Sequence, residues 1–148
     1  MIVPKKKIRR IIQSDVNGCG LACVAMVTNH TYAEVRKKAF EKLTGLAKNG
    51  YLTTSRDVKS LLNIFGFEGS RLIRFSFKNI SKIPDLCLFK INRHFDAEGV
   101  EYWHWVVFVR DDREMYILDP KKSIRTNKRK DWGRMNVVSY MSISKQQL

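Results

Sequence analysis

The chain has 148 residues, of which 44% are hydrophobic and 11% aromatic, and its formal net charge is +14. This composition excludes a disordered tail, and no apolar run approaches the ~20 residues that cross a bilayer. The length predicts a single domain over residues 1–148 with a core of its own. No signal peptide, metal site or cofactor is expected, and three cysteines without a disulfide spacing favour a reducing, cytoplasmic compartment.

The first predicted element is a loop that runs into a buried helix, over the stretch QSDVNGCGLACVAM at residues 13–26. An extended lead-in at residues 7–13 precedes it, and the almost wholly apolar helix runs from about residue 20 to residue 28. Asp15 and Asn17 are residue types that cap helix starts. Gly18 and Gly20, on either side of Cys19, would let another chain approach the sulfur closely.

Cys19 stands where this helix begins, and unpaired N–H groups and the helix dipole favour negative charge there. A thiol at such a place becomes the nucleophilic thiolate more readily. The side-chain amide of Gln13 could donate a hydrogen bond to an oxyanion that forms beside the sulfur. Taken alone, the Gly-Cys-Gly helix start is equally compatible with a small buried residue, which is how we interpret Cys23, one helical turn further on.

Two more helices and then several strands are expected along the rest of the chain. Thr31 and Glu34 have the spacing of a capping box, and a third helix begins at Thr53 or Thr54 and ends at Gly66. Short apolar or alternating runs predict strands at Ser70 to Phe75, Leu86 to Asn92, Trp103 to Val109, Met115 to Leu118 and Asn136 to Ser142. A hairpin turn at residues 110–113 joins two of them, and the order of elements predicts an α+β domain with N-terminal helices packed on an antiparallel sheet.

His104 and Asp119 lie at opposite ends of the two strands that this hairpin joins. Because antiparallel partners bring such ends together, we expect the two side chains to be adjacent. A carboxylate beside an imidazole fixes its tautomer and stabilises its charged form. His30 and His94 are rivals for the role of base, but His30 should lie at the far end of the first helix and His94 beside a polar loop.

The positive charge is partly clustered in two segments, at residues 5–10 and 121–130. Neither segment has a nucleic-acid-binding signature, so a solvated basic surface is favoured over a nucleic-acid site. In a functional version, this surface attracts an acidic protein partner. Reversal of Lys128, Arg129 and Lys130 to Glu should then slow partner capture without changing the reactivity of Cys19.

Together these residues resemble the bacteriocin-processing peptidases, a papain-like cysteine peptidase family that cleaves after double-glycine leaders. The resemblance spans about residues 8–131. The motifs that carry it are Gln13, Cys19-Gly20, Ala22-Cys23 and Ala25-Met26, then Ile83-Pro84-Asp85-Leu86, His104-Trp105-Val106-Val107 and Leu118-Asp119-Pro120. Their combination in this order implies a papain-like fold.

By position, the resemblance implies that Cys19 is the nucleophile and His104 the general base and acid. Asp119 then orients the histidine, and Gln13 donates to the oxyanion together with the backbone N–H of Cys19. Gly18 stands where the family usually has Asp. The family members that export bacteriocins also carry membrane spans and an ATPase, which this chain lacks, so coupled export is not expected.

The implied function is therefore a cysteine endopeptidase that acts on a protein or peptide substrate, either alone or as the toxic domain of a delivered bacterial effector. An effector would act in the cytoplasm of a target cell, and its producer would need an acidic immunity protein. The same three side chains could instead deamidate glutamine or transfer acyl groups. A third alternative is a non-enzymatic peptide-binding module.

Overall fold

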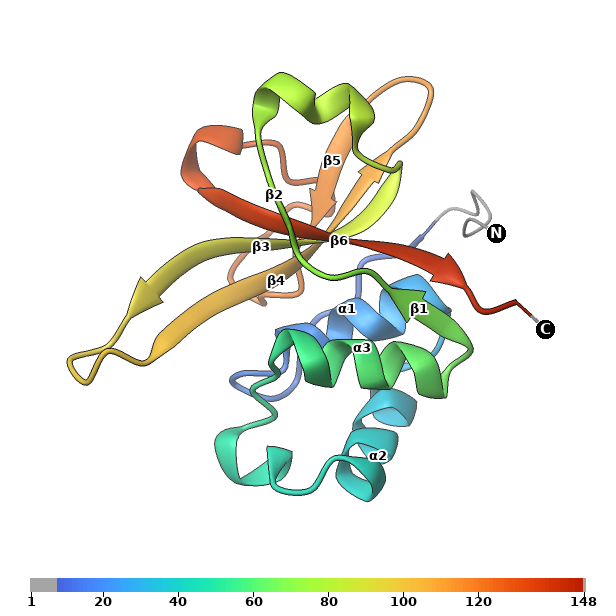
Figure 1. Cartoon of the computed structure of the whole chain (residues 1–148), viewed down its shortest axis with the longest axis vertical. Coiled ribbons are helices and arrows are strands. Elements are labelled where there is room, and N and C mark those ends of the chain that lie inside the picture. The colour runs from blue at the N-terminus through green and yellow to red at the C-terminus, as the bar shows by residue number, and fades with distance from the viewer. Residues whose placement is uncertain (1–7, 148) are drawn as a thin grey trace.

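The computed structural model describes residues 8–147, and its N-terminal half forms a layer of helices below a sheet (Figure 1). The helices are α1 (Cys19–Thr28), α2 (Tyr32–Lys42) and α3 (Ser55–Ile64), with a 3-10 turn, η1 (Leu46–Asn49), between the last two. All three predicted helices are confirmed. Capping boxes start α2, at Thr31 and Glu34, and α3, at Thr54 and Asp57, because each side chain satisfies an unpaired N–H at the helix start.

The start of α1 differs from the expectation. Its N-cap is Gly18, with no side-chain cap hydrogen bond. Asp15 instead accepts hydrogen bonds from the Tyr32 hydroxyl, at 2.6 Å, and from Arg36, at 3.0 Å. Asn17 donates to the carbonyl of Asn49, at 2.9 Å. These side chains tie the loop before α1 to α2 and η1, so the first N–H groups of α1 remain without a side-chain cap.

The sheet has six antiparallel strands in the order β1-β6-β3-β4-β5, with β2 also paired to β6. Their bounds are β1 (Phe67–Gly69), β2 (Ile73–Arg74), β3 (Leu86–Phe95), β4 (Glu101–Arg110), β5 (Met115–Leu118) and β6 (Val137–Lys145). The α+β prediction is confirmed. The strand predicted at residues 70–75 is reduced to two residues, and β3 extends three residues past its predicted end at Asn92.

Each face of the sheet buries its own apolar core. Trp105, Val107 and Leu118 face the helices, whereas Val106, Phe108 and Ile117 point to the other face. This alternation follows from the two-residue period of a strand. On that second face lie η2 (Phe77–Lys82) and η3 (Trp132–Arg134). Every residue of α1 is buried, because the helix lies between β4 and the other two α-helices.

The two glycines beside Cys19 serve packing within the chain rather than the approach of another chain. A Cβ atom at Gly18 would lie 2.1 Å from the Tyr32 hydroxyl, and one at Gly20 would lie 2.0 Å from Oγ1 of Thr53. Both positions are therefore already filled from α2 and from the segment before α3. The expectation that these two glycines let another chain approach the sulfur is wrong, because side chains of the protein itself fill the space beside them.

Gly20→Ala should therefore destabilise the protein by about 1–3 kcal/mol, the usual cost of overpacking a core. Thr53→Ala alone should cost little, because Oγ1 of Thr53 is buried without a hydrogen-bond partner. In the double variant Gly20→Ala/Thr53→Ala, the smaller side chain at residue 53 should recover part of the stability that Gly20→Ala loses. Urea unfolding of the wild type, the two single variants and the double variant measures this coupling. If the two losses of stability simply add, Thr53 is not what prevents a larger side chain at residue 20.

Candidate active site

Cys19 is the first residue of α1, and its sulfur lies against β4. The backbone N–H of Trp105 donates to Sγ at 3.5 Å. β5 pairs with β4 only from Val107 onward, so β5 does not cover this edge of β4 at His104 and Trp105. Cys19 is 6% exposed. This is less than we expected for a nucleophile in a partly open site. The sulfur therefore lies at a helix start and beside a backbone N–H donor.

The imidazole of His104 contacts Asp119, as predicted. Nε2 donates to Oδ1 of Asp119 at 2.7 Å. The antiparallel register places Val107 opposite Leu118. His104 comes three residues before Val107 and Asp119 directly follows Leu118, so both lie at the same end of the paired strands. Since Asp119 takes Nε2, only Nδ1 of the ring is left for the neighbouring Cys19, with which His104 interacts. The structure thus brings Cys19, His104 and Asp119 together.

Charge and hydrogen bonds stabilise the protonated form of His104. Burial opposes that charge, but the hydrogen bond to Asp119 and the interaction with Cys19 outweigh it and raise the pKa of His104 to about 9. Burial would raise the pKa of Asp119, but hydrogen bonds from His104, the backbone of Lys121 and Arg129 lower it. The pair is therefore an imidazolium beside a carboxylate at neutral pH.

This charge makes the stability of the fold depend on pH. The pKa of His104 is about 9 in the folded chain, against about 6.5 in an unfolded chain. The stabilisation is therefore complete below about pH 6.5 and is lost as the pH rises through about 9. We expect the free energy of unfolding of the wild type to fall across this window relative to His104→Gln. Urea unfolding of both proteins on either side of the window checks this, and parallel curves would contradict it.

Gln13 lies near the site but does not have a free amide. Its backbone N–H donates to the carbonyl of Pro120 at 2.9 Å. Its Nε2 donates to the carbonyls of Asp15, at 3.2 Å, and Val16, at 3.0 Å, while Oε1 is buried without a partner. Gln13 and His104 share the wall of a pocket of about 340 Å³. To donate to an oxyanion, the amide must release one of these loop carbonyls.

The rival residues lie away from this cluster. His30 follows the far end of α1, where its ring contacts Phe65. His94 is exposed on β3 and contacts the carbonyl of Asn92 at 3.0 Å. Cys23 is fully buried in the helical core, and burial raises the pKa of its thiol. Within residues 8–147, no group of three or more His, Cys, Asp or Glu side chains could hold a metal ion.

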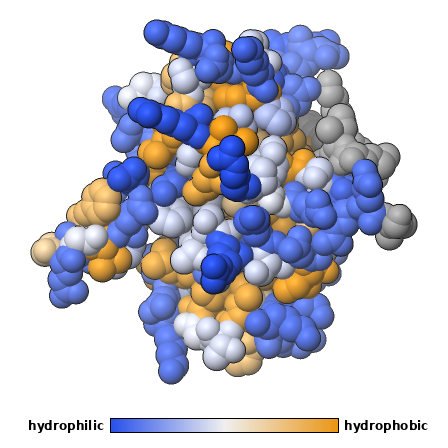
Figure 2. Space-filling view, viewed as in Figure 1, coloured by the Kyte–Doolittle hydropathy of each residue, from blue (hydrophilic) through white to orange (hydrophobic). Residues whose placement is uncertain are grey.

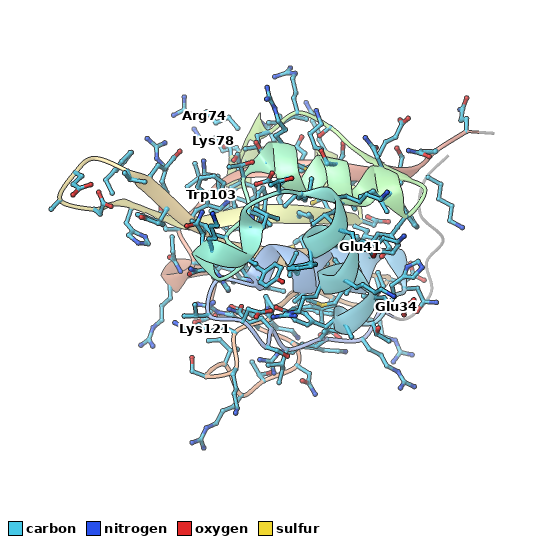
Figure 3. All side chains as sticks on the ribbon, turned by 90° about the horizontal axis from the view of Figure 1, so that it is seen from below. Glu34, Glu41, Arg74, Lys78, Trp103 and Lys121 are labelled. Carbon is cyan, nitrogen blue, oxygen red and sulfur yellow. The ribbon has the colours of Figure 1, made fainter. Side chains whose placement is uncertain are left out.

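The basic side chains of the described residues lie on more than one side of the molecule. Apolar and hydrophilic areas alternate on the face in Figure 2. In Figure 3, Arg74 and Lys78 lie on the opposite side of the view from Lys121. Lys128 and Lys130 are exposed and both bind Glu114. Lys5–Lys7 lie outside the described residues.

Two arginines that the sequence grouped with this surface instead hold the turn after β5. Arg129 is 9% exposed, and its Nη1 binds Oδ2 of Asp119 at 2.7 Å. Arg10 donates to the carbonyls of Asp119, Lys121 and Ile124. Reversal of Arg129 would therefore disturb the site itself. Sequence reasoning missed both, because a buried arginine within a basic run carries no local signal.

The sequence matches the Peptidase C39 family over residues 7–134. The chain belongs to the peptidase C39 family. This is a family of cysteine peptidases, so the prediction of a cysteine peptidase with an α+β fold is confirmed. None of the curated proteins matches the chain.

Two solved structures share the fold of this C39 peptidase. One is the peptidase domain of Streptococcus ComA, a bi-functional ABC transporter involved in a quorum sensing pathway. It has a TM-score of 0.64 and 16% identity, covering 95% of this chain and 100% of that chain. The other is a double glycine motif protease from an AMS/PCAT transporter in complex with the leader peptide. Its TM-score is 0.64, with 19% identity over 95% of this chain and 93% of that chain. Among residues 8–147 of the C39 peptidase, no helix is long and apolar enough to cross a membrane.

Proposed function

We propose that this C39 peptidase is an endopeptidase that cleaves a protein or peptide substrate through Cys19, His104 and Asp119. The observation that carries the proposal is the chain of contacts from sulfur to carboxylate. Cys19 lies beside the ring of His104, whose other nitrogen is bound to Asp119 at 2.7 Å. This is the arrangement of an activated nucleophile whose base is oriented by a third group.

In the proposed reaction, the Cys19 thiolate attacks the scissile carbonyl carbon and forms a carbon–sulfur bond. The oxyanion is stabilised by the N–H of Cys19, which has no intrahelical partner at the start of α1, and by the amide of Gln13. As the carbon–nitrogen bond breaks, the imidazolium of His104 gives its proton to the leaving amine. Neutral His104 then takes a proton from water, whose oxygen attacks the thioester; the carbon–sulfur bond breaks, the acid product leaves, and the thiolate of Cys19 and the imidazolium of His104 are restored.

Gln13→Ala should lower the turnover number on the order of 10²–10³-fold if its amide donates to the oxyanion. Part of this loss should come from a less rigid loop before α1, because the same amide donates to the carbonyls of Asp15 and Val16. Steady-state cleavage kinetics measure the loss, with the exposed neighbour Ser14→Ala as the control. Unchanged turnover in a folded Gln13→Ala protein would remove Gln13 from the mechanism.

The proposal is tested by a proteome-wide search for new protein N-termini after expression of the wild type or of Cys19→Ala. New termini that appear only with the wild type identify the substrate and its cleavage site. A peptide with a double-glycine motif is a second, defined substrate for the same comparison, because the AMS/PCAT neighbour is a double glycine motif protease. A mass increase of about one dalton in an uncut target, from exchange of an amide nitrogen for oxygen, would indicate deamidation instead.

A further inference from the structure

Arg129 differs from the basic residues around it. Lys128 and Lys130 are exposed and bind the same acidic side chain, that of Glu114. Arg129 is 9% exposed, and its backbone pairs with Ile117 of β5 through hydrogen bonds of 2.9 Å in both directions. This pairing fixes where the side chain starts, and the guanidinium turns into the protein while its neighbours turn to solvent.

The guanidinium of Arg129 joins two carboxylates. Nη1 binds Oδ2 of Asp119 at 2.7 Å, and Nε binds Oδ1 of Asp131 at 2.6 Å. Oδ1 of Asp119 faces Nε2 of His104, also at 2.7 Å. One fully buried carboxylate therefore lies between two cationic groups, with a separate oxygen for each. Asp131 holds the far side of the guanidinium, which limits how it can move.

Several other groups face this pair. The N–H of Lys121 donates to Oδ1 of Asp119 at 2.9 Å, and Arg10 holds its backbone carbonyl. Cys19 is beside His104, and the buried thiol of Cys23 lies near Asp119. Lys121 is also one of the residues that line the adjoining pocket. Among the described residues, His104 and Arg129 are the two whose charged groups bond directly to the Asp119 carboxylate.

We propose that Arg129 is a positioning residue, which turns Oδ1 of Asp119 toward His104 and shares the charge of that carboxylate with the imidazole. The inference rests on the proposed function, in which His104 must both hold a proton and release it. A carboxylate that served His104 alone would hold the imidazolium proton more tightly. The imidazolium would then be a weaker acid toward the leaving amine.

The test is an NMR titration of the imidazole ring signals, which the chain's three histidines make simple to assign. In Arg129→Met, the pKa of His104 should rise by about half a unit or more, because a positive charge at this range has been removed. Arg129→Lys, which keeps the charge, should return it close to the wild-type value. Arg129→Gln keeps a donor for Oδ2 without the charge, and is the variant to titrate if Arg129→Met does not fold.

Lys130→Met is the matched control, because it removes one charge from the same segment without a contact to Asp119. Its His104 should titrate as in the wild type. The inference is overturned if the pKa of His104 is unchanged or lower in the folded neutral Arg129 variant, or rises as much in Lys130→Met. The titration does not depend on cleavage. A Cys19→Ala protein that still cleaved the substrate would refute the proposed function, but it would not change the measured effect of Arg129 on the pKa of His104.

Discussion

Cys19→Ala is expected to abolish peptidase activity while the protein remains folded. The substitution removes the sulfur that would form the thioester and leaves the backbone N–H of residue 19 in place. The side chain is small, so we expect a loss of stability of about 1 kcal/mol or less. Cleavage of the substrate found in the N-terminus search measures activity, and urea unfolding measures stability.

The matched control is Cys23→Ala, on the same helix one turn further on. Cys23 is fully buried, and burial raises the pKa of its thiol, so it stays protonated within the core. This variant should keep its activity and lose roughly 1–2 kcal/mol of stability through the cavity that it leaves. An active Cys19→Ala protein alongside a folded, inactive Cys23→Ala protein would reverse the assignment of the nucleophile.

His104→Ala should reduce the cleavage rate on the order of 10²–10⁴-fold, the usual contribution of one general acid–base residue. The loss is expected because no other histidine in the described residues lies near Cys19. His94→Ala is the control, since His94 is exposed on β3 and should leave the rate unchanged. Equal rates for His104→Ala and the wild type would remove His104 from the mechanism and point to His94 or to a protein without this activity.

Asp119 is fully buried, so its role is best tested with a substitution that leaves a hydrogen-bonding group in its place. In Asp119→Ala, the buried guanidinium of Arg129 would lose its partner, and breaking a buried ion pair costs on the order of 3–5 kcal/mol. Asp119→Asn keeps an oxygen for one neighbour and should stay folded. It should retain some activity, because the orienting group is often the least critical member of such a set. A fully active Asp119→Asn protein would show that His104 is held in place without this carboxylate.

Much of the fold could be predicted from local patterns. Thr31 with Glu34 satisfies N–H groups at the start of its own helix, so this spacing alone predicted where α2 begins. The start of α3 was predicted at Thr53 or Thr54, and Thr54 caps it together with Asp57. The turn between β4 and β5 predicted a hairpin, and the hairpin brought His104 to Asp119. These features depend on neighbours in sequence or on one strand pairing, which a short pattern specifies.

The residues that were misjudged depend on contacts between distant segments. Gly20 is confined by Thr53, which lies just before α3. Arg129 belongs to a basic run in the sequence, yet its pairing with Ile117 turns it toward Asp119. The sequence by itself determined the three α-helices, strands β3 to β6 and the three side chains that meet at the site. Only the tertiary structure decided which polar groups bind them, because that choice depends on which buried charges and carbonyls come within hydrogen-bond distance after folding.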